Sequence, residues 1–238
     1  MKPTPVDAFM NPAAILTALQ LADSAFPTGM FSHSHGLEGM VRRGWVQTAA
    51  DVEEFLGNQC VWSLLPADGV ALVHAHRCTL AGDVATIAAI DRRLHAMRLP
   101  LELRNASTQV GNRLLAETAD FGPDETLAEY RLLVKRGGAP GSAAVSFGVA
   151  CAALGVPAET ALLASVHSYV SSELGAALRL LPLSHRDTQA MLRRLQVLVV
   201  EALPDLMRRD WCDMTSFTPQ LDVAALLHET DDLRMFAS

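Results

Sequence analysis

The chain has 238 residues, half of them apolar, with a mean hydropathy of +0.21 and a formal net charge of −7. This length and composition suit one domain with a large core, and the apolar surplus indicates surface that partner proteins cover. The negative charge and the lack of a basic patch argue against a nucleic-acid partner, and no apolar run is long enough to span a membrane.

Apolar residues recur at helical spacing along nearly the whole chain, and no segment alternates as a strand would. We therefore predict an all-α, single-domain helical bundle of about ten helices. Their expected positions, in chain order, are about 13–23, 36–43, 48–60, 66–82, 83–100, 100–119, 142–154, 157–181, 184–203 and 218 onward.

Several of these helices begin with recognisable capping sequences. Thr48 with Asp51, and Ser184 with Asp187, match the capping box, in which side chains and backbone N–H groups bond reciprocally. Pro66 fits the first turn of a helix, where its missing N–H leaves no hydrogen bond unmade. We therefore expect one helix to end before Pro66 and the next to begin there.

The expected helix at 142–154 is rich in small residues. Ala144, Gly148, Cys151 and Ala152 offer little bulk, so another helix can approach this one closely. Because an apolar-rich chain must cover its surplus surface, we predict that two copies pair through small-residue helices such as this one.

Segment 26–38 combines rigid turn residues with polar side chains immediately before a helix. Pro27 fixes one backbone torsion, and Gly29 and Gly36 permit conformations that other residues avoid. A plain connector would not need these restraints, so we predict that the segment presents side chains. Phe31 fits either a buried staple or an exposed anchor, and its polar neighbours Ser32 and His33 favour partial exposure.

This segment resembles the signature P-x-G-x-[YF]-[ST]-[HYQ]-S-x-G-L-E of UreF, the urease accessory protein family. Four further stretches resemble family motifs in the same order. They are the E-x-R helix with G-x-R-L at 102–114, the Gly/Ala-rich helix at 146–155, the R-L-x-P-L-S turn at 179–189, and the closing H-E at 228–229 with R-M-F-A-S at 234–238. The chain departs from the family at Phe31, where many relatives have tyrosine, at Ala143, where some have histidine, and at Met235, where leucine is usual.

The resemblance implies a non-enzymatic scaffold for nickel insertion into apo-urease. It implies a homodimer that binds the accessory protein UreD, also called UreH, recruits the GTPase UreG and docks on the urease apoprotein. Nickel would pass transiently, and no tightly bound cofactor is expected. The family-like domain would occupy residues 1–238, with a flexible N-terminus at about 1–10 and a partner-binding tail at about 230–238.

Partner binding is expected on the presenting segment and on the C-terminal tail. An arginine beside methionine and phenylalanine is a composition enriched at interface hot spots. We also expect the segment and the tail to lie near each other. The predicted partner-binding residues are Phe31, Ser32, His33, Glu38, His228, Glu229, Arg234, Met235 and Phe236.

Two histidine pairs, His33 with His35 and His74 with His76, raise the hypothesis of a metal site. Residues two apart on a helix point about 200° apart, so neither pair chelates from one helical face. His74 and Cys78, four apart, are the weak remaining candidates. Two ligands do not close a site, and we expect no stable metal centre.

The sequence lacks a P-loop, a G-x-S-x-G elbow and an H-E-x-x-H helix, so no catalytic residue is expected. Two alternatives remain open: a helical metal-dependent enzyme that uses His33, His35 or His74 with Cys78, and a helical adaptor unrelated to urease. The four scattered cysteines fit reduced thiols, and the N-terminal segment lacks an apolar signal core. We therefore predict a cytoplasmic protein.

Overall fold

The structure is a computed structural model that describes residues 11–229, 231, 235 and 236. Within these residues the chain forms a single helical domain without strands, which confirms the predicted fold class. The α-helices are α1 (Pro12–Ala22), α2 (Leu37–Arg42), α3 (Ala49–Gln59), α4 (Val70–Leu80), α5 (Val84–Met97), α6 (Leu101–Glu117), α7 (Glu125–Lys135), α8 (Ala143–Ala153), α9 (Ala158–Leu180), α10 (His185–Leu206) and α11 (Pro219–His228). Two 3₁₀ turns, η2 (Met30–Ser32) and η4 (Trp211–Asp213), and a π-helical segment, η3 (Cys60–Gly69), complete the set.

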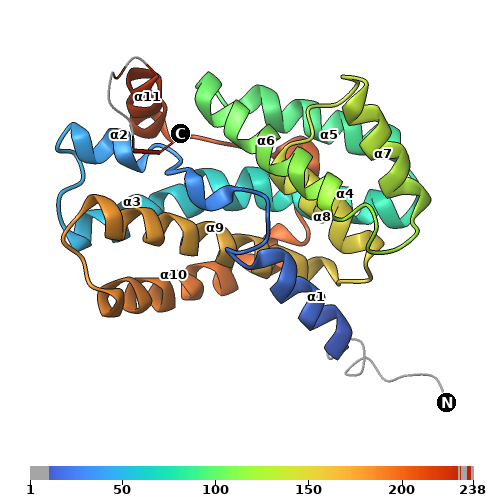
Figure 1. Cartoon of the computed structure of the whole chain (residues 1–238), viewed down its shortest axis with the longest axis horizontal. Helices are drawn as coiled ribbons and strands as arrows, with labels where there is room; N and C mark the ends of the chain where they lie inside the picture. The colour runs from blue at the N-terminus through green and yellow to red at the C-terminus, as the bar shows by residue number, and fades with distance from the viewer. Residues whose placement is uncertain (1–10, 230, 232–234, 237–238) are drawn as a thin grey trace.

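Helix α4 lies in the middle of the bundle and contacts α5, α8 and α9. Figure 1 shows α9 and α10 side by side along one edge, with α5, α6 and α7 toward the opposite end. Helix α11 packs on α2 and α6, so the end of the chain returns to its beginning. No helix in the described part of the chain is long and apolar enough to cross a membrane.

The capping sequences form the helix starts that they predict. Thr48 and Asp51 make a capping box at the start of α3, and Ser184 and Asp187 make another at the start of α10. Because these bonds satisfy backbone N–H groups that no helical carbonyl can reach, they fix where each helix begins.

The predicted helix boundary at Pro66 is wrong. Pro66 lies inside the π-helical segment η3, which joins α3 to α4 without a break. In an α-helix the ring of a proline clashes with the carbonyl four residues earlier, here that of Trp62, whereas a π-helix bonds residues five apart. The Trp62 carbonyl accepts the backbone N–H of Phe217 at 2.8 Å, so a distant segment is bonded to η3 at this point.

Helix α8 is packed inside the chain. Its residues from Ala144 to Ala152 are all buried. A Cβ atom added to Gly148 would lie 2.4 Å from the carbonyl oxygen of Leu72, so the backbones of α8 and α4 are in direct contact. The close approach is as predicted, but its partner is α4 of the same chain, which contradicts the prediction that two copies pair through α8.

Candidate partner-binding site

The presenting segment, residues 26–38, is fixed by its backbone conformation. Gly29 and Gly36 have φ angles of 78° and 93°, in the left-handed region that favours glycine. Added Cβ atoms would collide with Arg113 Nη1 at 2.3 Å and with Leu221 Cδ1 at 2.2 Å, respectively. Between these glycines, η2 leaves the ring of Phe31 54% exposed. The segment therefore presents Phe31 outward, as expected.

Helix α9 anchors this segment through backbone carbonyls. The Ser172 hydroxyl donates to the carbonyl oxygen of Met30 at 3.3 Å. Arg179 Nη2 donates to the carbonyl oxygen of Phe31 at 3.1 Å. Because both bonds engage the main chain, they position η2 without covering the Phe31 ring.

A third contact with α9 joins His35 Nδ1 to Glu173 Oε1 at 2.7 Å. Burial lowers the pKa of His35 to about 4, helped by the positive charge of Arg98. Burial also raises the pKa of Glu173 well above its usual range. Burial thus disfavours the charged form of each group, and a hydrogen bond joins the carboxyl group to the imidazole ring.

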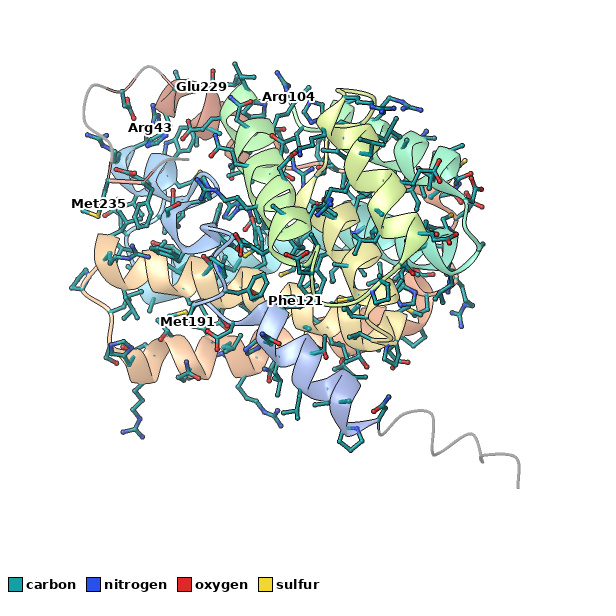
Figure 2. All side chains as sticks on the ribbon, turned by 45° about the vertical axis from the view of Figure 1, so that its right-hand side comes forward. Arg43, Arg104, Phe121, Met191, Glu229 and Met235 are labelled. Carbon is teal, nitrogen blue, oxygen red and sulfur yellow. The ribbon has the colours of Figure 1, made fainter. Side chains whose placement is uncertain are left out.

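The C-terminal tail is held by Glu38, which is buried in the first turn of α2. Its carboxylate accepts the backbone N–H of Met235 at 2.9 and 3.2 Å and that of Phe236 at 2.9 Å. The Phe236 ring is buried, and the guanidinium carbon of Arg179 lies 4.6 Å from its centre. The Met235 side chain, in contrast, is 64% exposed at the rim of the molecule (Figure 2).

Arg179 thus touches both the presenting segment and the tail, which lie next to each other as expected. The residues that meet here come from η2, α2, α9 and the tail. We call them the loop–tail cluster: Phe31, Glu38, Arg179, Met235 and Phe236.

A buried histidine between two carboxylates supports the cluster from behind. His228 Nδ1 lies 2.9 and 3.0 Å from the two carboxylate oxygens of Glu102, and its Nε2 lies 3.3 Å from Glu38 Oε2. The neighbouring Glu229, labelled in Figure 2, accepts the backbone N–H of Glu102 at 3.1 Å. The end of α11 is therefore fastened to the starts of α6 and α2.

The predicted partner-binding residues divide into exposed and buried ones. Phe31 and Met235 are exposed, whereas His33, Glu38, His228 and Phe236 are buried. Phe236, a predicted partner-binding residue, is buried because its ring packs beneath Arg179.

The remaining predicted residues either make local contacts or lie outside the residues that the structure describes. The Ser32 hydroxyl donates to the carbonyl oxygen of Gly29 at 2.7 Å and helps to close η2. Burial, with the nearby charges of His35 and Arg113, lowers the pKa of His33 to about 4. The predicted residue Arg234 and the flexible N-terminus at 1–10 lie outside the described residues.

Three residues of this region, Arg179, Glu102 and Glu173, have roles that the sequence did not predict. The first two occur only as letters of longer motifs, and their partners lie more than a hundred positions away in the chain. Glu173 carries a local signal, because it falls on the apolar stripe of α9 with Val166 and Val170. An acidic residue on such a stripe indicates a buried polar contact.

The weak metal candidates are engaged in other contacts. His74 Nε2 lies 2.8 Å from the carbonyl oxygen of Arg209. Burial and the charge of Asp83 raise the pKa of Cys78, which disfavours the thiolate that binds metals. Among the described residues, no group of three or more His, Cys, Asp or Glu side chains is arranged to hold a metal ion.

Comparison with known proteins gives a consistent result. The family model described as UreF matches residues 46–196. The chain is 35% identical to urease accessory protein UreF of Arthrobacter sp. (strain FB24), over 94% of this chain and 96% of that protein. It is also 35% identical to urease accessory protein UreF of Paenarthrobacter aurescens (strain TC1), over 94% of this chain and 97% of that protein. Urease accessory protein UreF 2 of Brucella canis is 34% identical to it, over 93% of this chain and 91% of that protein.

Proposed function

The chain belongs to the urease accessory protein UreF family, and from this membership we propose that it is a non-enzymatic scaffold for nickel insertion into apo-urease. It works in the cytoplasm as a homodimer, binds the accessory protein UreD (UreH) and recruits the GTPase UreG. The resulting complex docks on the urease apoprotein. Nickel is the cargo of this process and passes transiently, so the scaffold needs no resident cofactor.

The observation that supports a recruiting surface is the construction of the loop–tail cluster. Glu38 and Arg179 hold two segments together that lie about 200 positions apart in the chain. The cluster exposes the side chains of Phe31 and Met235. Aromatic residues and methionine are enriched at protein interfaces, and a surface ordered before binding loses less conformational entropy on docking.

A scaffold of this kind regulates a GTPase by binding one of its conformations more tightly than another. The ligand that prefers one state shifts the equilibrium toward it by its difference in affinity. A fixed surface suits this role, because it binds tightly only the partner conformation that fits it. We therefore assign UreG recruitment to the exposed side of the loop–tail cluster.

The test is capture of UreG by the complex of this chain with UreD. Replacing both Phe31 and Met235 with alanine removes exposed side chains and leaves Glu38, Arg179 and Phe236 in place. We expect at least about a tenfold loss of affinity for UreG, since interface anchors of this type contribute on the order of 1 to 2 kcal/mol each.

Leu80→Ala is the matched control, because Leu80 is 70% exposed on α4 and belongs to no part of the cluster. This variant should capture UreG as the wild type does. Circular dichroism checks that all variants keep their helicity. Undiminished capture by the well-folded double variant would remove the cluster from the UreG interface.

A further inference from the structure

A second surface, unrelated to the loop–tail cluster, is a groove of about 580 Å³ between α2, α3, η3 and the start of α11. Its floor is made of apolar side chains that belong to the core, among them Phe55 and Leu221. Three large aromatic side chains form its walls, with exposed fractions of 48% for Trp45, 56% for Trp62 and 72% for Phe217. Such exposure of three rings around one hollow is not explained by core packing.

The π-helical segment η3 holds two of these walls in position. The backbone N–H of Phe217 donates to the carbonyl oxygen of Trp62 at 2.8 Å. The N–H of Thr215 donates to the carbonyl oxygen of Pro66 at 3.3 Å, and the hydroxyls of Ser63 and Ser216 are 2.8 Å apart. The stretch 215–217 is thus tied along η3, and the groove exists before any partner arrives. Segments of π-helix occur frequently at functional sites.

The charged residues that line the groove are all acidic. Its lining includes the carboxylates of Asp51 and Glu54. The structure describes all of the lining residues, and none of them is Lys, Arg or His. Asp51 is engaged in the capping box, where bonds from the N–H groups of Gln47 and Thr48 lower its pKa and keep it ionised. Glu54 is exposed, and no ion pair within the described residues engages it.

We propose that this groove docks a basic segment of a partner protein and takes an arginine side chain between the aromatic walls. A guanidinium group stacks on indole and phenyl faces and pairs with carboxylates, and it keeps less of its hydration shell than an ammonium group. Apolar residues beside the arginine lie on the floor near Phe55. The net charge of −7 favours such a basic partner over a second copy of this acidic chain.

The probe is the peptide acetyl-Leu-Arg-Leu-amide, with the neutral isostere acetyl-Leu-citrulline-Leu-amide as its control. Two of the three tryptophans, Trp45 and Trp62, line the groove, so tryptophan fluorescence reports binding directly. The arginine peptide should give a saturable change at least about fivefold tighter than the citrulline peptide, because cation–π and ion-pair contacts together exceed about 1 kcal/mol. Equal affinities, or no saturable change with the arginine peptide, would overturn the proposal.

Two variants locate the binding. Glu54→Gln should bring the affinity ratio of the two peptides down by about half or more, whereas Glu129→Gln, at an exposed position on α7, should leave it unchanged. Phe217→Ala should weaken binding of the arginine peptide about fivefold, and Leu80→Ala should not. Equal effects of target and control variants would place the peptide elsewhere and contradict the proposal.

Light scattering tests the competing occupant, a second copy of the chain. The proposal expects Trp62→Ala to leave the oligomeric mass of the protein unchanged. A fall in mass in this variant, with no peptide binding by the wild type, would show that the groove is a self-association surface. Neither outcome depends on urease or its accessory proteins, so the groove and the proposed function fail separately.

Discussion

The seam between α4 and α8 and the loop–tail cluster both join segments far apart in the chain, but they do so by opposite means. At the seam, the absence of a side chain at Gly148 lets two backbones touch, and the surroundings are apolar and buried. At the cluster, the long polar side chains of Glu38 and Arg179 reach across to backbone groups and to a ring.

The difference concerns how each region tolerates change. A close-packed seam has no room to adjust, so added atoms shift whole helices. Polar contacts to a tail can be broken and made again while the helices stay in place, since few apolar groups are involved. The seam therefore sets the stability of the fold, and the cluster sets the order of a surface.

The largest effect is expected at the seam. Gly148→Leu places several atoms where the carbonyl of Leu72 already lies, and we expect a loss of at least about 3 kcal/mol in the free energy of unfolding. Urea denaturation followed by circular dichroism measures this loss.

Gly175→Ala on α9 is the matched control. An added Cβ atom at Gly175 meets nothing within 4 Å, so alanine should stabilise the protein by about 0.5 to 1 kcal/mol through its better helix propensity. If Gly148→Leu unfolds at the same urea concentration as the wild type, the direct backbone contact between α4 and α8 is wrong.

The second effect comes from the contact of His35 with Glu173, which ties the presenting segment to α9. The pKa of His35 in the folded state is about 4, below its ordinary 6.5, so the unfolded chain binds more protons between these values. Taken alone, the shift of His35 leaves stability full above about pH 6.5 and lowers it by up to about 3 kcal/mol as the pH drops toward 4. Thermal unfolding at a series of pH values measures this fall.

Glu173 acts in the opposite direction. Because its pKa is raised in the folded state, stability falls as the pH rises above the ordinary value near 4.5. Between about pH 4.5 and 6.5 the two dependences offset each other in the wild type. Glu173→Gln removes the second one, so this variant should have a higher melting temperature at neutral and higher pH, and it should lose stability as the pH drops from 6.5 toward 4. His167→Gln, at an exposed position, should change neither the loss of stability at low pH nor the loss at high pH. A Glu173→Gln curve that is flat from pH 4 to 6.5 would show that His35 is not buried uncharged.

Local signals predicted much of the fold. The capping boxes at Thr48 and Ser184 and the small residues of α8 act within one helix or across one contact, so their spacing in the sequence carries the information. The predicted helix boundary at Pro66 was wrong because the contacts around this residue are not local in the sequence. The segment that holds Pro66 adopts the π-helical register and accepts a hydrogen bond from Phe217, about 150 positions later.

The candidate site was predictable to the same extent. The glycines that flank η2 indicate a presented side chain, and Phe31 is exposed. The burial of Phe236 depends on Arg179 and on the carboxylate of Glu38, and no spacing rule relates a tail residue to these helices. An exposed and a buried aromatic residue look alike in the sequence when the packing partner is remote.

The last prediction separates order in the tail from stability of the fold. Glu38→Ala removes the acceptor of the backbone N–H groups of Met235 and Phe236, and it deprives buried His228 of one of its two carboxylates. A lost buried acceptor costs about 2 kcal/mol, less than the change expected at the seam. The helices should remain, because within the described residues the hydrogen bonds and ion pairs of Glu38 run to its own segment, to the tail and to α11, and none of them runs to α4 or α8.

Hydrogen exchange followed by mass spectrometry on a C-terminal peptide measures the order of the tail. In Glu38→Ala the amides of Met235 and Phe236 should lose their protection, while amides of α8 keep most of theirs. The exposed Glu129→Ala serves as control and should leave both regions protected. Because the proposed UreG surface includes Met235, a tail released in this way should also weaken capture of UreG. Unchanged protection of the tail would mean that the Phe236 ring beneath Arg179, and not the carboxylate of Glu38, is sufficient to hold it.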